Sequence, residues 1–245
     1  MREKTNFKRV AFTVCILMMA ALSCKKSDYL TDTGIHNPIT PLNNYDYLAI
    51  NQLHQFDTTL ILIDKLGLKD EVNKAATFFA PTDYSILRTI NARLTLKQQV
   101  NPAATYTLDS LVKAITQDSL RMYMFDKTIN LDNAPEFQAQ PYTSLGHTSQ
   151  GVIKVLQTGS PYTDRTSAPT YLLFFVKVRG AVDIPGVTPP ANESDISVVC
   201  QTTGILTSNG ATTLHVLNNN HFFYDNGSGP GRSLSTSVSS HSRFR

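Results

Sequence analysis

The segment Thr77–Asp83, which reads Thr-Phe-Phe-Ala-Pro-Thr-Asp, constrains the fold of this chain most. The run Phe78–Ala80 is apolar and rich in aromatic carbon, which is typical of a strand covered on both faces. Pro81 has no backbone N–H and therefore ends the strand. Thr82 or Asp83 can then accept hydrogen bonds from the free N–H groups at the start of a helix. The segment predicts a buried strand that turns directly into a helix, and none of its side chains indicates catalysis.

Helical periodicity dominates the first half of the chain. One apolar stripe recurs every three or four residues and comprises Leu53, Phe56, Leu60 and Ile63. Gly67 follows this stripe and can end the helix in a left-handed cap. Later stripes predict further helices, and they comprise Ile86, Ile90 and Leu94; Leu108, Leu111 and Ile115; and Leu120 with Met124.

The second half of the chain reads as strands separated by loops. Runs rich in branched and aromatic residues predict strands at 152–156, 171–178, 196–200, 204–207 and 214–217. Asn209 and Gly210 both tolerate positive φ and predict a two-residue hairpin turn. Cys200 lies in one of these runs, and we expect it to pack in the core rather than to act as a reactive thiol.

The amino terminus has the composition of an export signal. Four basic residues precede an apolar run from Val10 to Leu22 that is too short to span a bilayer. The segment Ala21–Cys24 resembles a bacterial lipobox, which implies cleavage before Cys24 and attachment of lipid to its sulfur. The alternative is an ordinary signal peptide in which the cysteine stands by chance. Lys25 follows the cysteine, and by analogy with other bacterial lipoproteins it indicates the outer membrane of a Gram-negative cell.

These signals divide the chain into four parts. Residues 1–23 are the predicted lipoprotein signal peptide, 24–44 a polar tether, 45–226 the folded domain, and 227–245 a Ser- and Gly-rich tail expected to be disordered. Loss of the signal peptide removes four basic residues and one acidic residue, so the formal charge of +3 falls to zero. A neutral chain gives no electrostatic case for nucleic acid. With Cys24 acylated, the one remaining cysteine leaves no internal disulfide.

Two segments of the chain resemble the fasciclin-like domain, an extracellular adhesion module. The first resembles the opening signature of that family and comprises Thr77, Phe79, Ala80, Pro81, Thr82 and Asp83. The second resembles its closing motif and comprises Asn209, Gly210 and His215. The family's Tyr-His pair, which is associated with receptor binding, is absent from residues 122–127. The resemblance implies an α+β wedge, in which helices of the N-terminal half pack on a β-sandwich-like pair of sheets from the C-terminal half.

Motifs of catalysis and metal binding are absent from the sequence. It contains no phosphate-binding loop, no His-Glu-x-x-His, no Cys-x-x-Cys and no Gly-x-Ser-x-Gly. None of its six histidines stands three or four residues from another, so we expect no metal site and no cofactor. His215 alternates within a strand, and we expect it to be a core or hydrogen-bonding residue. A Ser/His/Asp arrangement stays open, because its members need not be close in sequence.

We expect a non-enzymatic lipoprotein of the cell envelope, held at the outer membrane by its lipid and facing the surface or the periplasm. Its first expected function is cell adhesion or interaction with a surface protein, which an exposed apolar patch would support. The alternative is an accessory glycan-binding lipoprotein of an outer-membrane polysaccharide-uptake system. Exposed aromatic side chains would support that alternative, and the candidates for carbohydrate contact are Tyr142, Tyr162, Phe222, Phe223 and Tyr224. A third hypothesis, an exported hydrolase, would need His147 or His215 beside a carboxylate and a hydroxyl.

Overall fold

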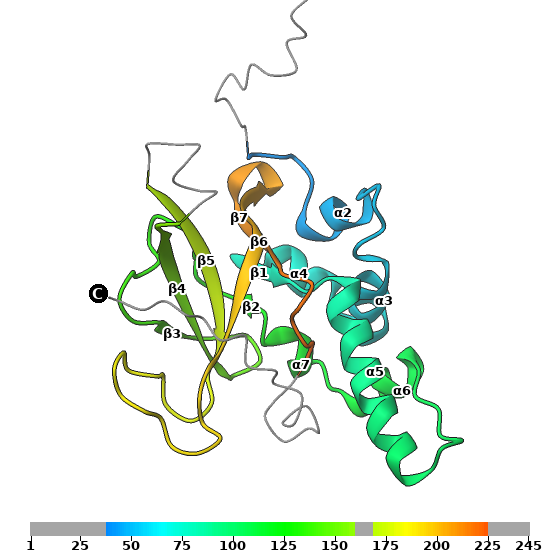
Figure 1. Ribbon diagram of the computed structural model, residues 1–245. Coiled ribbons are helices and arrows are strands. Elements are labelled where there is room, and N and C mark those ends of the chain that lie inside the picture. Colours follow the sequence, from blue (N-terminus) through cyan, green and yellow to red (C-terminus); the bar gives the residue numbers. More distant parts are fainter. Residues whose placement is uncertain (1–37, 160–168, 225–245) are drawn as a thin grey trace, which may run out of the picture. The chain divides into compact units, whose positions relative to one another are not determined.

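The computed structural model describes residues 38–159 and 169–224 (Figure 1). The predicted signal peptide, Cys24, Tyr162 and the tail 227–245 lie outside these residues. The helices of the described part are α2 (Asn44–Ala49), α3 (Asp57–Leu66), α4 (Lys69–Lys74), α5 (Asp83–Val100), α6 (Leu108–Ala114) and α7 (Asp118–Arg121). Its strands are β1 (Thr77–Ala80), β2 (Met124–Phe125), β3 (Gln140–Thr143), β4 (Ser149–Gln157), β5 (Thr170–Lys177), β6 (Ile196–Thr207) and β7 (Thr212–Leu217).

The strands form one mixed sheet of seven strands in the order β2-β1-β7-β6-β5-β4-β3. Neighbouring strands are antiparallel except β1 and β7, which run parallel. The α+β class is as predicted, but the strands do not divide into two separate sheets. Strand β6 is the reason, because its first half pairs with β5 and its second half with β7. Shifts of register between Cys200 and Ile205 interrupt this long strand, and such irregularities bend a strand and increase its twist.

Strand β1 lies inside this sheet and is buried along its whole length, as its sequence predicts. Its neighbours are β2 on one side and β7 on the other. Phe79 packs against the ring of Phe175 with 5.1 Å between ring centroids, and its ring stacks on that of His215 at 4.8 Å. The first motif of the sequence is therefore a central element of the core.

The turn that follows β1 differs from the prediction in where its side chains bind. Helix α5 begins at Asp83, but neither the hydroxyl of Thr82 nor any other side chain caps it. Asp83 Oδ1 instead accepts hydrogen bonds from the N–H groups of Thr58 and Thr59, at 2.8 and 3.1 Å, in the first turn of α3. The hydroxyl of Thr82 donates to Asn219 Oδ1 at 2.9 Å. The carboxylate thus caps the neighbouring helix, and the turn joins α3, α5 and the chain beyond β7.

The first predicted helix ends at Gly67 as expected, but it begins later in the chain than its apolar stripe predicts. Helix α3 begins at Asp57, so Leu53 precedes it and is 74% exposed. Gly67 ends the helix with φ of 68°, and the N–H of Leu68 donates to the carbonyl of Ile63. The helix predicted to include Met124 is too long, because α7 stops at Arg121 and the following residues pair with β1 as β2.

The predicted tether reaches too far into the folded region. The N–H of Thr40 donates to the carbonyl of Leu206, and the N–H of Leu206 donates to the carbonyl of Pro38, both at 2.8 Å. Asn44, the last tether residue, begins α2 and is fully buried. Residues 38–44 therefore belong to the folded unit, which begins at Pro38. Among the residues that the structure describes, no helix has both the length and the hydropathy needed to cross a membrane.

Candidate binding site on the sheet

One face of the sheet carries apolar side chains away from the core. Val152 and Phe175 are paired across β4 and β5 and lie in the core. Side chains alternate along a strand, so the flanking pairs point to the opposite side. We call this opposite side the outer face. Its partly exposed apolar residues on β4, β5 and β6 are Ile153, Val155, Leu172, Phe174 and Val199, whereas Val176 on the same side is buried.

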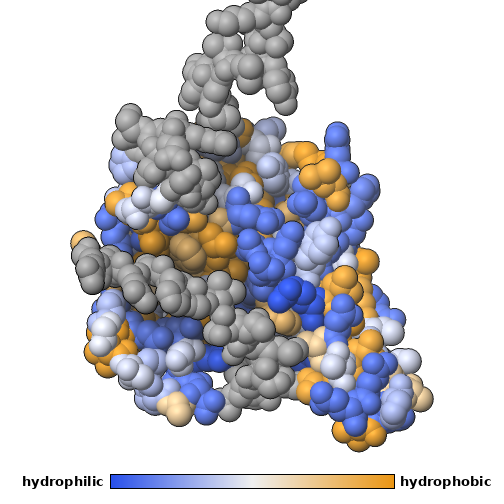
Figure 2. Space-filling model, in the orientation of Figure 1, coloured by the Kyte–Doolittle hydropathy of each residue, from blue (hydrophilic) through white to orange (hydrophobic). Residues whose placement is uncertain are grey.

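The outer face is partly open to solvent. Val155 is 39% exposed, and the other four side chains of this set are partly exposed. Figure 2 shows a hydrophobic area in the part of the molecule where Figure 1 places β5 and β6. An apolar sheet face of this kind is unusual, because a strand with one open face normally alternates apolar and polar residues.

A hollow of about 270 Å³ adjoins the outer face where β5 ends and β6 begins. Its wall is formed by Phe174, Lys177, Ile196, Ser197, Val198, Val199, Asn218, Asn220, His221 and Phe222. Phe174 and Val199 of the outer face also line the hollow, so the hollow adjoins the outer face at these two residues. The remaining wall supplies an ammonium group, two amides and a hydroxyl.

Lys177 places a positive charge at the base of the hollow. It follows Leu173 and Phe175 at the core-facing positions of β5 and is only 4% exposed. Its Nζ donates to the carbonyl of Phe222 at 2.6 Å. A buried ammonium requires hydrogen-bond acceptors, so this contact fixes the segment that follows β7 against the end of β5.

His221 lies beside Lys177 and is held neutral. The N–H of Tyr224 donates to the hydroxyl of Tyr123 at 3.2 Å, and that hydroxyl contacts His221 Nε2 at 2.7 Å. Burial lowers the pKa of His221 well below its usual value, and the charge of Lys177 lowers it further. A neutral buried imidazole here fixes the geometry of the hollow rather than supplying charge.

The candidate aromatic residues for glycan contact divide into buried and accessible ones. Phe223 is fully buried and stacks on Tyr123 with 5.8 Å between ring centroids, so it cannot contact a glycan. Phe222, Tyr142 and Tyr224 are partly exposed. Of these, Phe222 lines the hollow, and the guanidinium of Arg88 lies 4.5 Å from the centre of its ring.

The two histidines considered for catalysis occupy different environments. His215 is fully buried; its Nε2 contacts the carbonyl of Ile129 at 2.8 Å, and its Nδ1 accepts the N–H of Gly204 at 3.2 Å. Burial lowers its pKa to about 4. His147 is exposed in the turn between β3 and β4. Neither histidine contacts a carboxylate within the described residues, so the pairing that the hydrolase hypothesis requires does not form there.

The closing motif forms a longer turn than predicted. Strand β6 ends at Thr207 and β7 begins at Thr212, so Asn209 and Gly210 belong to a four-residue connection with a 3-10 turn. Ser208, Asn209 and Gly210 all have positive φ, at 52°, 56° and 92°. The free thiol of Cys200 is buried, and burial raises its pKa, consistent with a packing role.

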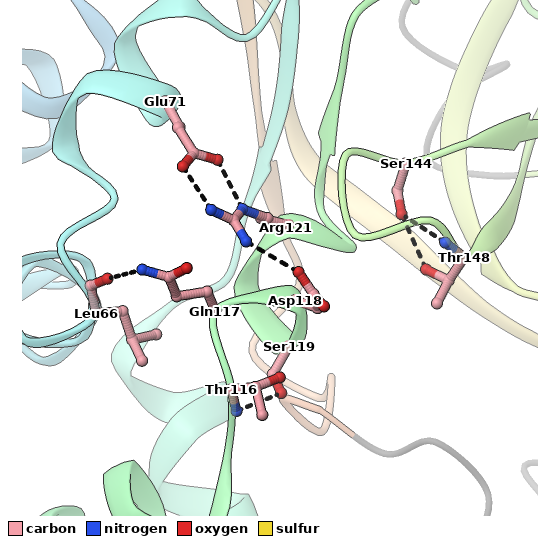
Figure 3. A network of polar contacts seen from close by, with 9 residues as sticks. All are labelled: Leu66, Glu71, Thr116, Gln117, Asp118, Ser119, Arg121, Ser144 and Thr148. Atoms are coloured by element: carbon pink, nitrogen blue, oxygen red, sulfur yellow. Dashed lines mark hydrogen bonds and ion pairs between the residues drawn. The ribbon is translucent and has the colours of Figure 1, made fainter.

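A second polar network links helices rather than forming a site (Figure 3). Arg121 donates to both carboxylate oxygens of Glu71, at 2.6 and 2.7 Å, and to Asp118 at 3.0 Å. The hydrogen bonds from Arg121 are the main reason that the pKa of Glu71 is lowered. Since Glu71 lies on α4 and Arg121 on α7, the pair joins two helices. Within 38–159 and 169–224, no group of three or more His, Cys, Asp or Glu side chains is arranged to hold a metal ion.

Sequence reasoning missed most of the hollow. Lys177 and Asn218 were not candidates, because a lysine at a strand end and an asparagine in a turn have ordinary solvent-exposed explanations. One signal was present. Lys177 follows Leu173 and Phe175 at intervals of two residues, and side chains at this spacing point to the same side of a strand, here the core side of β5. No family model matches this chain, and no curated protein is significantly similar to it in sequence.

Proposed function

We propose that this chain is a non-catalytic, lipid-anchored protein of the cell envelope, with a fasciclin-like domain whose outer face binds another surface protein. The observation that carries this proposal is the set of partly exposed apolar side chains on three neighbouring strands, which adjoins the hollow. Contiguous apolar surface of this kind marks sites of protein interaction in soluble domains. It is a better match to a protein surface than to a polysaccharide.

The fasciclin-like assignment is supported by the way the two motif segments meet. Phe79 of the first motif stands in register with His215 of the second across the parallel pair β1 and β7. Their rings stack at 4.8 Å in the core. Segments far apart in the chain therefore form one structural unit, as expected of two signatures that belong to the same domain.

The anchor in this proposal is a lipid on Cys24, and the outer membrane is its expected location. Because the folded unit begins at Pro38, the tether comprises residues 24–37 rather than 24–44. We expect this polar segment to connect the lipid to the folded domain.

The chemistry of the hollow specifies what the protein partner presents. Phe174, Val198 and Phe222 offer apolar wall, which accommodates one apolar anchor side chain. The amides of Asn218 and Asn220 line the same space and can donate to backbone carbonyls that flank the anchor. The partner is thus a protein segment with an apolar side chain between exposed peptide groups.

Glycan binding in polysaccharide uptake is the second candidate function. It is favoured by Phe222, which lines the hollow with Asn218 and Asn220 and is partly exposed. An aromatic ring beside amide groups can stack on one sugar face and hydrogen-bond to its hydroxyl groups. The outer-face residues that do not line the hollow, Ile153, Val155 and Leu172, have no role in this alternative, and that difference allows a direct test.

The test compares two phenylalanines. A photo-crosslinking phenylalanine analogue is placed at position 174, in the outer face, or at position 137, where Phe137 is 88% exposed and outside the hollow. Cross-linking in intact cells followed by mass spectrometry identifies the protein captured at position 174. Binding of that purified protein to the full chain in detergent is then measured for Phe174→Ser and for the control Phe137→Ser.

The proposal expects Phe174→Ser to weaken binding about tenfold or more, as for an anchor residue, and Phe137→Ser to leave it unchanged. Equal capture at both positions, or equal affinity of both variants, would contradict it. Retention of cell-surface polysaccharide that is lost in Phe222→Ala but kept in Leu172→Ser would favour the glycan alternative instead.

A further inference from the structure

A separate cleft of about 640 Å³ lies along the last turns of α5 and the loop toward α6. Its charged and polar lining residues are Arg93, Lys97, Asn101, Thr105 and Tyr106. Arg93 and Lys97 are four residues apart in α5 and therefore lie on the same side of the helix. Among the described residues no carboxylate lines the cleft, and none of them lines both the cleft and the hollow on the sheet.

The two cations of the cleft are not neutralised by neighbours. Neither Arg93 nor Lys97 forms an ion pair within the described part of the chain. Lys97 stands in the last turn of α5, where the helix dipole contributes only about half a negative charge. Two full positive charges therefore remain at one wall of the cleft.

Tyr106 adds a hydrogen-bond donor whose acceptor is absent. The side chain is 8% exposed, and its hydroxyl oxygen is buried with no hydrogen-bond partner among the described residues. Lys97 Nζ lies 5.8 Å from the centre of the Tyr106 ring. Buried hydroxyl groups in folded proteins almost always have a partner, so an unpaired one on a residue that lines the cleft points to an acceptor that arrives with a ligand.

Asn101 offers a further donor at the end of the helix. Its side-chain oxygen accepts the N–H of Ala103 at 3.0 Å, which fixes the orientation of the amide group. The NH₂ of the same amide is then available to a ligand. Cation, amide and phenol donors without a competing carboxylate make a set that selects for negative charge.

We propose that this cleft binds an oxyanion, which is the phosphate, sulfate or carboxylate group of a small ligand or of a lipid headgroup. Arg93 and Lys97 provide the charge, and Asn101 and Tyr106 donate hydrogen bonds to the oxygens. Binding draws Lys97 away from the Tyr106 ring and brings an acceptor to the phenol. The site does not depend on the protein-binding function of the outer face.

Inorganic phosphate is the first probe, added to the isotope-labelled full chain in neutral detergent. Nuclear magnetic resonance follows the side-chain amide of Asn101 and the backbone amide of Tyr106. The test variant is Arg93→Gln with Lys97→Gln. The control is Lys113→Gln with Lys127→Gln, which removes the same charge from exposed positions outside the cleft.

Saturable shifts at Asn101 and Tyr106 are expected, with affinity about tenfold lower in the test variant and unchanged in the control. Absence of saturable shifts, or an equal loss of affinity in the control, would overturn the proposal. Tyr106→Phe gives an independent measure, because it removes the phenol without changing charge. We expect this variant to fold normally and to bind phosphate more weakly, whereas phosphate affinity equal to that of the unmodified chain would remove Tyr106 from the site.

Two further probes distinguish a soluble ligand from a lipid headgroup as the source of the anion. Glycerol phosphate represents a soluble ligand, and vesicles of phosphatidylcholine with phosphatidylglycerol represent a headgroup, with pure phosphatidylcholine vesicles as their control. The acyl anchor holds every form of the chain on vesicles, so the readout is the Asn101 and Tyr106 shifts rather than sedimentation. Shifts that require phosphatidylglycerol and vanish in the test variant assign the site to a headgroup, whereas shifts with glycerol phosphate assign it to a soluble ligand.

Discussion

The carboxylate of Asp83, at the start of α5, accepts the backbone N–H of Thr58 in the first turn of α3 at 2.8 Å. The same oxygen accepts the N–H of Thr59 at 3.1 Å, and the carbonyl of Gln55 accepts the N–H of Asp83. The amino-terminal ends of the two helices therefore share one acidic residue. Because α3 has no side-chain cap of its own, its first turn depends on a residue from the next part of the chain.

Asp83→Ala should destabilise the protein by about 1–2 kcal/mol, the usual cost of losing a helix cap. The matched control is Asp70→Ala, which removes an exposed carboxylate from the first turn of α4. Urea unfolding followed by circular dichroism measures the difference. Equal stabilities for the two variants would show that the contact with α3 contributes nothing beyond the charge.

His215 should make the stability of the fold sensitive to acid. Burial lowers its pKa to about 4 against the usual 6.5, although the contact with the carbonyl of Ile129 acts in the opposite direction. Between these two pH values the unfolded chain binds a proton that the folded chain does not, so stability falls as pH falls from 6.5 to 4. The expected loss is about 3 kcal/mol, and this residue causes no further loss below pH 4.

His215→Gln tests this origin of the acid sensitivity. The variant keeps an amide that can donate to Ile129 and lacks the titration, so the difference in unfolding free energy between pH 7 and pH 4 should shrink. His54→Gln is the control, because His54 is exposed. An unchanged pH dependence in His215→Gln would assign the acid sensitivity elsewhere, with His221 as the first alternative.

The neighbours Phe222 and Phe223 should respond very differently to truncation. Phe223 is fully buried against Tyr123, so Phe223→Ala should cost about 3–5 kcal/mol of stability. Phe222 is partly exposed and lines the hollow, so Phe222→Ala should cost much less. Thermal and urea unfolding of the two variants give the comparison. A large loss in Phe222→Ala would mean that this ring supports the fold rather than a binding surface.

Arg121 and Glu71 should contribute modestly despite their short contacts. Their side chains are 23% and 39% exposed, so solvent screens the pair, and a coupling of about 0.5–1 kcal/mol is expected. A double-mutant cycle with Arg121→Met and Glu71→Gln isolates this coupling. The stabilisation should be lost as pH falls and Glu71 is protonated, because its pKa is lowered in the folded state.

Lipid attachment at Cys24 should decide where the protein resides. Cys24→Ser should abolish incorporation of labelled fatty acid and move the protein from the detergent phase to the aqueous phase on phase separation. Cys200→Ala is the control, since Cys200 is a buried thiol in β6 and should not change either result. Labelling that persists in Cys24→Ser would contradict the proposal that lipid is attached at Cys24.

The elements that could be predicted are those specified by short-range rules. Residues Phe78–Pro81 combine apolar side chains with a residue that cannot extend a ladder, and they form the expected buried strand before a helix. Gly67 with Leu68 forms the expected helix end, because a left-handed residue and its apolar neighbour act within one turn.

Contacts between distant segments could not be predicted in this way. Residues 38–40 join Leu206 through backbone groups, which every residue carries and which leave no pattern in side chains. Asp83 has the right chemistry for a cap, but only the packing of α3 against it selects the helix that it caps. The carbonyl of Phe222 accepts a hydrogen bond from buried Lys177, and the sequence of β5 does not specify that partner.

The parallel pairing of β1 with β7 has a consequence for the order in which the protein acquires its structure. A ribosome delivers Thr77–Ala80 long before Thr212–Leu217, so β1 has only the short strand β2 as a possible neighbour until nearly the whole domain has been synthesised. Pairing between segments so far apart folds slowly, because a long loop must close first. The central part of the sheet is therefore completed only late in the synthesis of the chain.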